Sequence, residues 1–277
     1  MISQEKINDI LKIVSKEPRT IQELSKELGI SWITAEKYIE ELKKNTGLID
    51  VKHIKVGYNT IKLIYSTNKI SSNEIEDNLF SKIKATNSKI GFNFLEIFQY
   101  VPKDRAKGYT LKDCDDLDPK LVFEYLDKSN FVYFFSGNLS FLKMKYKSQT
   151  LIDKLELKLK NGLKIKIIAR IDIDTLKNIN LLIPLIHKYP SSIELKHQLQ
   201  PLRGIIFDCG HAIFKDQKEG KNYKLHELEK DVTLIYDIYD DTWINFFMNL
   251  FWYNYKTAIN YDQKLDVINR VYKTKLK

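Results

Sequence analysis

Two charged residues, Arg203 and Asp208, enclose a short apolar run in a way that is typical of a strand at a binding site. The run Gly204–Phe207 has the composition of a buried strand, and a turn signal at residues 200–202 precedes it. A guanidinium in that position can bind phosphate or carboxylate through two parallel hydrogen bonds. The alternative is a structural ion pair between Arg203 and Asp208 or another acid. The candidate ligand-binding residues are Ser136, Asn138, His197, Arg203 and Asp208.

The spacing around Arg203 also resembles the catalytic motif of phospholipase D-type enzymes, which reads histidine, any residue, lysine, four residues, aspartate. Arg203 stands in the place of the lysine and Asp208 in that of the aspartate, but Pro201 stands in the place of the histidine. A prolyl ring can neither attack phosphorus nor carry a proton, so covalent phosphohistidine chemistry is not available there. The resemblance implies a domain of that fold that binds without cleaving, and no catalytic residue is assigned.

An enzymatic alternative depends on His197, which lies four residues before Pro201 and could replace the missing nucleophile. The chain would then be a nuclease or phosphodiesterase of the phospholipase D superfamily with a rearranged active site, although nucleophilic catalysis demands tight placement. No metal site is expected, because Cys209 and His211 lack a second pair of ligands with the spacing of structural zinc. The isolated glycines form no nucleotide-binding fingerprint, so we expect no cofactor.

Strands and helices alternate between residues 115 and 261, which predicts a mixed sheet covered by helices. The apolar run 131–135 ends in a polar loop that begins at Ser136, as expected of a buried strand with a site at its carboxyl end. The aromatic residues of a predicted helix at 241–258 recur at helical spacing and are expected to be core. Further strands are expected at 163–169, 193–197, 204–208, 212–215 and 232–238, and a helical tail at 262–277 is expected to pack back or join a dimer.

Residues 1–68 have the pattern of a winged helix-turn-helix domain. Apolar residues at helical spacing predict three helices, at 3–16, 20–28 and 31–44. Thr20 and Glu23 form a capping box that opens the second helix, and Gly29 provides the turn to the third. Two β-rich runs, 48–55 and 60–65, predict the hairpin that would form the wing. This order resembles the winged heads of archaeal and bacterial transcription regulators.

Such a domain would bind double-stranded DNA. The N-terminal turn of the third helix would enter the major groove and read base edges, whereas polar groups of the wing would contact backbone phosphates and position the domain. The candidate DNA-binding residues are Ser31, Trp32, Thr34 and Lys37 on the helix and Lys52, Lys55, Tyr58 and Asn59 on the wing. The alternative is a winged helix that contacts another protein, with lysines that only solvate its surface.

The composition is that of a folded, basic protein. The 277 residues carry a net charge of +9, which favours a polyanionic partner, and can form more than one core. Two cysteines are too few for a disulfide framework, and no stretch approaches the length of a membrane span. We therefore expect a reduced, cytoplasmic protein with no membrane partner. The aromatic run at 92–101 should dock on the second domain or on a partner subunit.

The whole order of elements resembles that of TrmB-type archaeal regulators, which join a winged helix to a phospholipase D-like domain. The resemblance implies an α/β multi-domain protein with the winged domain at 1–68, a connector at 69–114, the phospholipase D-like domain at 115–261 and the tail at 262–277. It also implies a DNA-binding transcription regulator whose degenerate pocket senses a small-molecule effector, often a sugar, whereas Arg203 itself favours an anion. The single copy of the motif suggests a homodimer. The operator, the effector and the direction of regulation do not follow from these patterns.

Overall fold

The computed structural model describes residues 3–46, 48–56, 59–66, 72–87, 91–111, 117–218 and 231–275. The chain divides into two compact units. Unit 1 comprises Met1–Leu79, Asn93–Asp115 and Asp216–Tyr236, and unit 2 comprises Phe80–Phe92, Asp116–Lys215 and Asp237–Lys277. Each unit therefore combines stretches that are distant in sequence, whereas the predicted domains follow one another along the chain. Helix α4 (Ser72–Ala85) and strands β11 (His211–Lys218) and β12 (Val232–Ile238) each span a boundary between units.

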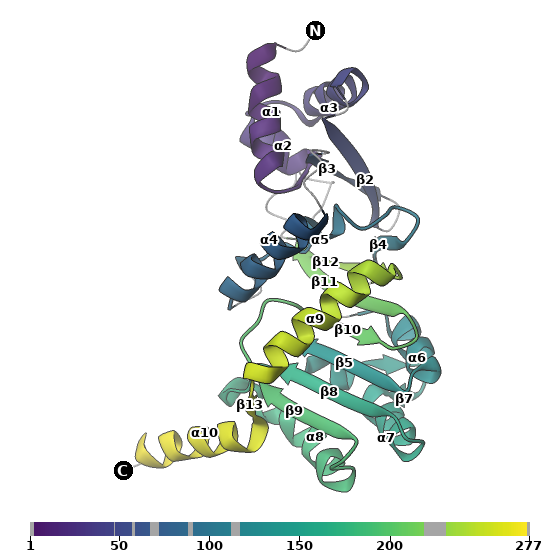
Figure 1. The fold of residues 1–277 in the computed structure, drawn as a ribbon, viewed down its shortest axis with the longest axis vertical. Coiled ribbons are helices and arrows are strands. Elements are labelled where there is room, and N and C mark those ends of the chain that lie inside the picture. The colour runs from purple at the N-terminus through teal and green to yellow at the C-terminus, as the bar shows by residue number, and fades with distance from the viewer. Residues whose placement is uncertain are drawn as a thin grey trace. The chain divides into compact units, whose positions relative to one another are not determined.

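Unit 1 begins with the three predicted helices, α1 (Gln4–Lys16), α2 (Ile21–Glu27) and α3 (Trp32–Thr46) (Figure 1). The predicted capping box opens α2, since the Thr20 hydroxyl accepts from the Glu23 amide and the Glu23 carboxylate accepts from the Thr20 amide. A left-handed residue, Gly29, follows α2 at φ 64°, a conformation that glycine adopts without steric cost. The helices enclose a core that includes Ile10, Val14, Leu24, Ile39 and Leu42.

The predicted wing is also present in unit 1. Strand β2 (Ile49–Val56) pairs antiparallel with β3 (Asn59–Ser66) along its whole length, with Ile49 opposite Ser66 at one end, and the short β1 (Arg19–Thr20) pairs with β3. Strand β4 (Ala106–Thr110) lies parallel to β2 on its other side, and the strand order is β1-β3-β2-β4-β12. The winged helix-turn-helix arrangement is therefore confirmed, and β1 and β4 extend the wing hairpin on its two sides.

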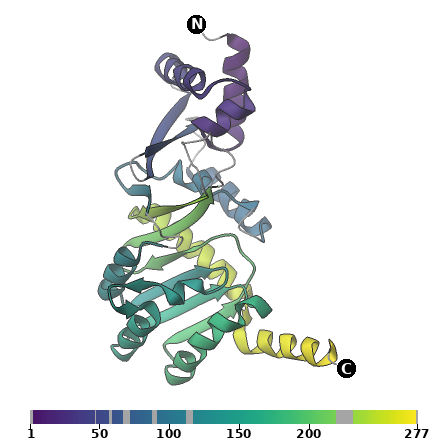
Figure 2. The same ribbon diagram turned by 180° about the vertical axis from the view of Figure 1, so that it is seen from behind.

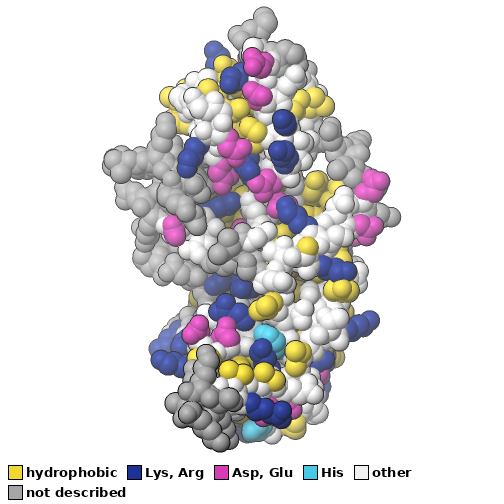
Figure 3. Space-filling view, turned by 90° about the vertical axis from the view of Figure 1, so that its left-hand side faces the viewer, with side chains coloured by type: hydrophobic (Ala, Val, Ile, Leu, Met, Phe, Trp, Pro, Cys, Tyr) yellow, Lys and Arg dark blue, Asp and Glu magenta, His cyan; other side chains and the backbone are white. Residues whose placement is uncertain are grey.

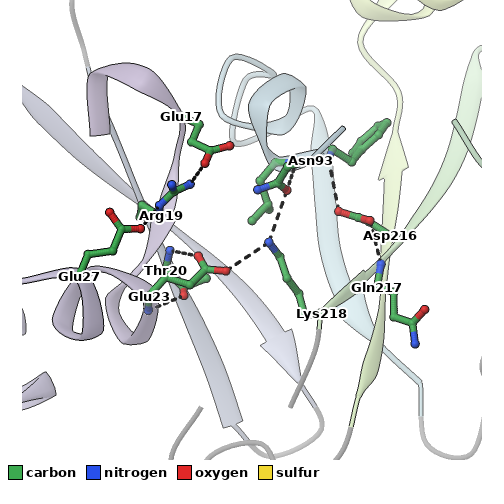
Figure 4. A network of polar contacts seen from close by, with 11 residues as sticks. Glu17, Arg19, Thr20, Glu23, Glu27, Asn93, Asp216, Gln217 and Lys218 are labelled. Carbon is green, nitrogen blue, oxygen red and sulfur yellow. Dashed lines mark hydrogen bonds and ion pairs between the residues drawn. The ribbon is translucent and has the colours of Figure 1, made fainter. Parts of the chain in front are cut away.

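Two later stretches of chain complete unit 1. Helix α5 (Leu95–Phe98) lies in the aromatic run, and the Phe94 and Phe98 rings lie 4.7 and 4.8 Å from the ring of Tyr236 on β12. The run therefore packs within unit 1. Lys218 of β11 contacts the Glu23 carboxylate at 3.5 Å and donates to Asn93 at 3.4 Å (Figure 4). These contacts connect the second helix to residues that follow it by 70 and by 195 positions.

Unit 2 contains the predicted mixed sheet. Strands β5 (Phe131–Ser136), β8 (Lys164–Ala169) and β9 (Ile193–His197) are parallel. Strand β10 (Gly204–Phe207) pairs antiparallel with both β5 and β11, and β13 (Ile259–Asn260) pairs antiparallel with β9, which gives the order β11-β10-β5-β8-β9-β13. A separate hairpin pairs β6 (Lys145–Tyr146) with β7 (Gln149–Thr150).

Helices cover both faces of this sheet (Figures 1 and 2). Helix α9 (Asp241–Thr257) crosses one face, and α6 (Pro119–Lys128), α7 (Leu151–Lys160) and α8 (Leu176–Lys188) lie on the other. The aromatic stripe of α9 is core as predicted, with its buried members Trp243, Phe246, Phe247, Leu250, Phe251 and Tyr255. The last helix, α10 (Tyr261–Lys275), extends away from the sheet. No helix within the described ranges is long and apolar enough to cross a membrane.

Candidate functional site

A cavity of about 670 Å³ opens in unit 2 where strands β5 and β8 end. The two strands are parallel with Ser136 opposite Ala169, so the residues that follow them meet at one edge of the sheet. Ligands commonly bind at the carboxyl ends of parallel strands. The polar residues that line the cavity are Asn87, Ser136, Asn138, Ser140, Arg170, Gln200, Arg203 and Lys215. Three of the predicted five ligand-binding residues, Ser136, Asn138 and Arg203, are therefore brought together.

The Arg203 guanidinium is held by the backbone rather than by an acid. Its Nη1 donates to the carbonyls of Gln200 and Leu202 at 3.0 and 2.6 Å. A Cβ atom added at Gly137 would lie 2.4 Å from the Arg203 Nε, so only glycine lets the guanidinium rest against this loop. Burial, and then the nearby charge of Arg170, lower the pKa of Arg203 to about 10. The group therefore stays cationic near neutral pH, and it forms no ion pair with an acidic residue of the described chain.

The loop that follows β5 is fixed by hydrogen bonds. The Ser136 hydroxyl accepts from the Leu139 amide at 2.9 Å, which holds Leu139 in the left-handed region at φ 59°. Asn178 donates to the Asn138 carbonyl at 2.7 Å, and the Gln200 amide donates to the Ser136 carbonyl at 3.2 Å. The loop is thus organised before any ligand arrives, at a cost in backbone strain that such contacts offset.

Asp208 does not belong to this cavity, and its predicted place there was wrong. Its carboxylate accepts from the Asn130 amide at 3.1 and 3.2 Å, at the amino end of β5. Strand β10 runs antiparallel to β5, so Gly204 lies opposite Phe135 and Phe207 opposite Val132. Five residues of extended chain separate Arg203 from Asp208 by roughly 16 Å. The alternative of an ion pair between these two residues is excluded by the same geometry.

His197 lies at the same sheet edge but two strands away from β5, and it does not line the cavity. Its Nδ1 accepts from the Ile171 amide at 2.9 Å. Burial lowers the pKa of His197, and the charge of Lys264 acts in the same direction, so the imidazole is neutral near pH 7. This ring supports the chain after β8, and its predicted place among the ligand-binding residues was wrong.

Five polar residues of the cavity were missed by the sequence reasoning, namely Asn87, Ser140, Arg170, Gln200 and Lys215. Arg170 directly follows the predicted strand 163–169, which was a usable signal, whereas Lys215 comes from a strand whose pairing the sequence does not reveal. Arg170 pairs with Asp172 at 2.8 Å. The lining within the described chain contains three cationic side chains and no acidic one, so the cavity favours an anion.

The predicted recognition turn of α3 is exposed in unit 1. The Ser31 hydroxyl accepts from the Thr34 amide at 3.1 Å and lies 2.7 Å from the Thr34 hydroxyl, which caps the helix. Ser31, Trp32 and Lys37 are exposed, and Thr34 is partly buried. Ile33, which sequence reasoning did not single out, is 63% exposed. Farther along the helix, Glu36 pairs with Lys62 of β3.

The wing residues divide into three groups. Lys55 is exposed and makes no ion pair with any described residue. Tyr58 lies outside the described residues, as does the side chain of Asn59. Lys52 was predicted wrongly as a phosphate contact, because it is 5% exposed and its ammonium donates to the carbonyls of Phe98 and Val101. On the face in Figure 3, Lys and Arg side chains are interspersed with Asp and Glu.

No protein-family model matches the chain, and no curated protein sequence matches it either. Several solved structures are similar at low identity. TrmBL2, described as an archaeal chromatin protein with a novel mode of DNA binding, is 15% identical over 88% of both chains, with a TM-score of 0.40. The phospholipase D family member Nuc from Salmonella typhimurium is 12% identical over 56% of this chain and 98% of its own, with a TM-score of 0.38. NucT from Helicobacter pylori is 10% identical over 57% and 99%, with a TM-score of 0.39. At this distance, what the chain binds has to follow from its own residues.

Proposed function

We propose that this protein is a double-stranded DNA-binding transcription regulator. The observation that carries the proposal is the exposed first turn of α3, with Ser31, Trp32 and Lys37 open to solvent next to an antiparallel wing. In this geometry the helix enters the major groove while Lys55 of the wing contacts a backbone phosphate. The net charge of +9 favours the same polyanionic partner.

The unit 2 cavity supplies the second half of the proposed function, which is binding of an anionic effector without cleavage. Arg203, Arg170 and Lys215 provide the positive charge. Pro201 occupies the position where phospholipase D-type enzymes have a histidine nucleophile, and no histidine is among the described residues that line the cavity. A phosphate or carboxylate would therefore be held by the guanidinium and the preset loop. A homodimer, which presents two α3 helices to a two-fold operator, completes the proposal.

The DNA half is tested by selecting bound fragments from the source genome and measuring fluorescence anisotropy on one selected and one random duplex. Trp32→Ala and Lys37→Ala are expected to reduce the preference for the selected duplex. Lys12→Ala, an exposed lysine on α1, is the matched control and should change neither affinity. Failure of the wild-type protein to bind any duplex at low salt would favour the protein-contact alternative.

The enzymatic alternative is tested separately. The purified protein is incubated with labelled single- and double-stranded DNA, with and without EDTA, and compared with Arg203→Ala. We expect no cleavage by either protein. Reproducible cleavage that disappears in Arg203→Ala would identify a rearranged active site and overturn the effector-binding role of unit 2.

A further inference from the structure

Unit 1 contains a second cavity, of about 690 Å³, which is formed entirely by its own residues. It lies along β2 and β4 and beside the chain from Phe98 to Lys103. Its volume falls within the range of small-molecule binding sites, which is about 300–1,000 Å³. Neither the winged helix-turn-helix pattern nor the anion site of unit 2 accounts for this cavity.

The lining of this cavity is strongly basic. Five lysines and one histidine border it, namely Lys43, Lys52, His53, Lys55, Lys103 and Lys107, and none of the described residues that line it is acidic. Asp50 on β2 accepts from both Lys43 and Lys103 at 2.6 Å. Burial alone would raise the pKa of Asp50, but the hydrogen bonds from these lysines hold it below its usual range. One carboxylate therefore pairs with two ammonium groups, and the described residues at the cavity carry more positive than negative charge.

Lys52 is the buried lysine of this lining. Its ammonium lies 4.7 Å from the centre of the Phe98 ring and donates to the Phe98 and Val101 carbonyls. Burial, and then the charge of Lys103, lower the pKa of Lys52 to about 7. An anion in the cavity would favour the charged form of this amine, so binding and proton uptake would support each other.

The positions of the lysines favour a small ligand over a DNA backbone. Lys43 and Lys103 meet at Asp50, near the start of β2, whereas Lys55 lies near its end, roughly 16 Å farther along the strand. Phe98, Pro102 and Tyr109 form an apolar part of the same wall, with Tyr109 opposite Lys55. A concave site that combines cations near both ends of β2 with apolar groups matches a compact molecule with both phosphate and apolar parts.

We propose that the unit 1 cavity binds a small phosphorylated molecule of about nucleotide size. The site is separate from the proposed anion site of unit 2 and from the DNA contacts of α3, and it shares only Lys55 with the proposed wing contact. It would give the DNA-binding unit a ligand of its own.

The test is isothermal titration calorimetry of the full-length chain with ATP and, separately, with inorganic phosphate. Saturable binding of ATP is expected. Lys103→Gln and Lys107→Gln should each weaken it by about tenfold, because each removes a charged partner of the phosphate. Lys12→Gln is the matched lysine control and should have no effect. Thermal melting of each variant shows whether it is folded.

Two further arms locate the site. Arg203→Ala should retain one equivalent of ATP binding, and addition of Lys107→Gln to this variant should weaken it by about tenfold. Binding that disappears in Arg203→Ala and survives Lys107→Gln would place the ligand in unit 2 and overturn the proposal. A short duplex DNA shares only Lys55 with this cavity, so it should weaken ATP binding by a few-fold at most. Full competitive displacement by the duplex, or absence of any ATP binding, would also overturn the proposal and would assign these lysines to the DNA backbone or to solvation.

Discussion

The two cavities are both positive, but they obtain their charge in different ways. In unit 2 an arginine is fixed by two backbone carbonyls and by close contact with Gly137. In unit 1 the charge comes from lysines, of which one is buried with a pKa of about 7 and two share Asp50. A guanidinium cannot lose its proton near neutral pH, whereas a buried ammonium can. The first cavity should therefore be rigid and insensitive to pH, and the second should respond to it.

The largest expected effect is on the pH dependence of stability. The unfolded amine of Lys52 has a pKa near 10.5 and the folded one about 7, so between these values the unfolded state binds more protons. The free energy of unfolding should therefore rise by a few kcal/mol from pH 7 to about pH 10. In Lys52→Met this contribution should be absent. Urea unfolding at pH 7 and 9.5 measures the free energy of unfolding of both proteins. If this free energy changed equally with pH in the wild type and in Lys52→Met, the low pKa of Lys52 would be contradicted.

The next effect concerns the fixed arginine. Gly137→Ala would place a methyl group on the guanidinium, so binding of inorganic pyrophosphate to unit 2 should weaken by about thirtyfold, or about 2 kcal/mol. Calorimetry in a Lys107→Gln background isolates this site. Gly210→Ala is the control, since an added Cβ there has nothing within 4 Å and the change costs only backbone strain. Unchanged affinity in Gly137→Ala would mean that the arginine does not need its present position.

A smaller effect is expected for Asp208, which lies outside the cavity. Asp208→Ala removes the acceptor of the Asn130 amide and should cost about 1 kcal/mol of stability. Pyrophosphate affinity should stay within about twofold, because the residue lies at the far end of β5. Denaturant melts and calorimetry on the same variant provide both numbers. A large loss of pyrophosphate affinity with little loss of stability would show that Asp208 takes part in ligand binding.

The smallest effect tests whether unit 1 uses its surface lysine and its buried lysine differently. Lys55→Ala should weaken binding to selected and random duplexes alike, by a few-fold, and reduce the salt dependence by about one ion. Lys52→Met should leave that salt slope unchanged, because its ammonium is buried. Anisotropy titrations between 50 and 200 mM salt give both slopes. Equal slope changes in the two variants would show that Lys52 reaches the DNA.

Local signals in the sequence predicted much of the fold. The capping box at Thr20, the apolar spacing of α1 and the aromatic stripe of α9 are short-range features, and all three are present. Ser136 and Asn138 line the unit 2 cavity, because they lie in the polar loop that follows a buried strand. These elements depend on neighbouring residues only.

The wrong predictions concern residues whose neighbours in the structure are far away in the sequence. Asp208 seemed to accompany Arg203 because the motif gives spacing and not strand direction. Lys52 seemed exposed because its partners, Phe98 and Val101, are 46 and 49 residues away. A signal was available for Lys52, since it lies two positions before the buried Ile54 and so shares its face of β2.

The contacts of Lys218 with Glu23 and Asn93 have a practical consequence for anyone who wishes to isolate the DNA-binding part. A fragment that stops after β3 would lose the Lys218 partner of the second helix, as well as the carbonyls that receive the Lys52 ammonium. Such a truncated protein would expose a cation that normally has almost no access to water. The shortest fragment that keeps these contacts has to extend through Lys218.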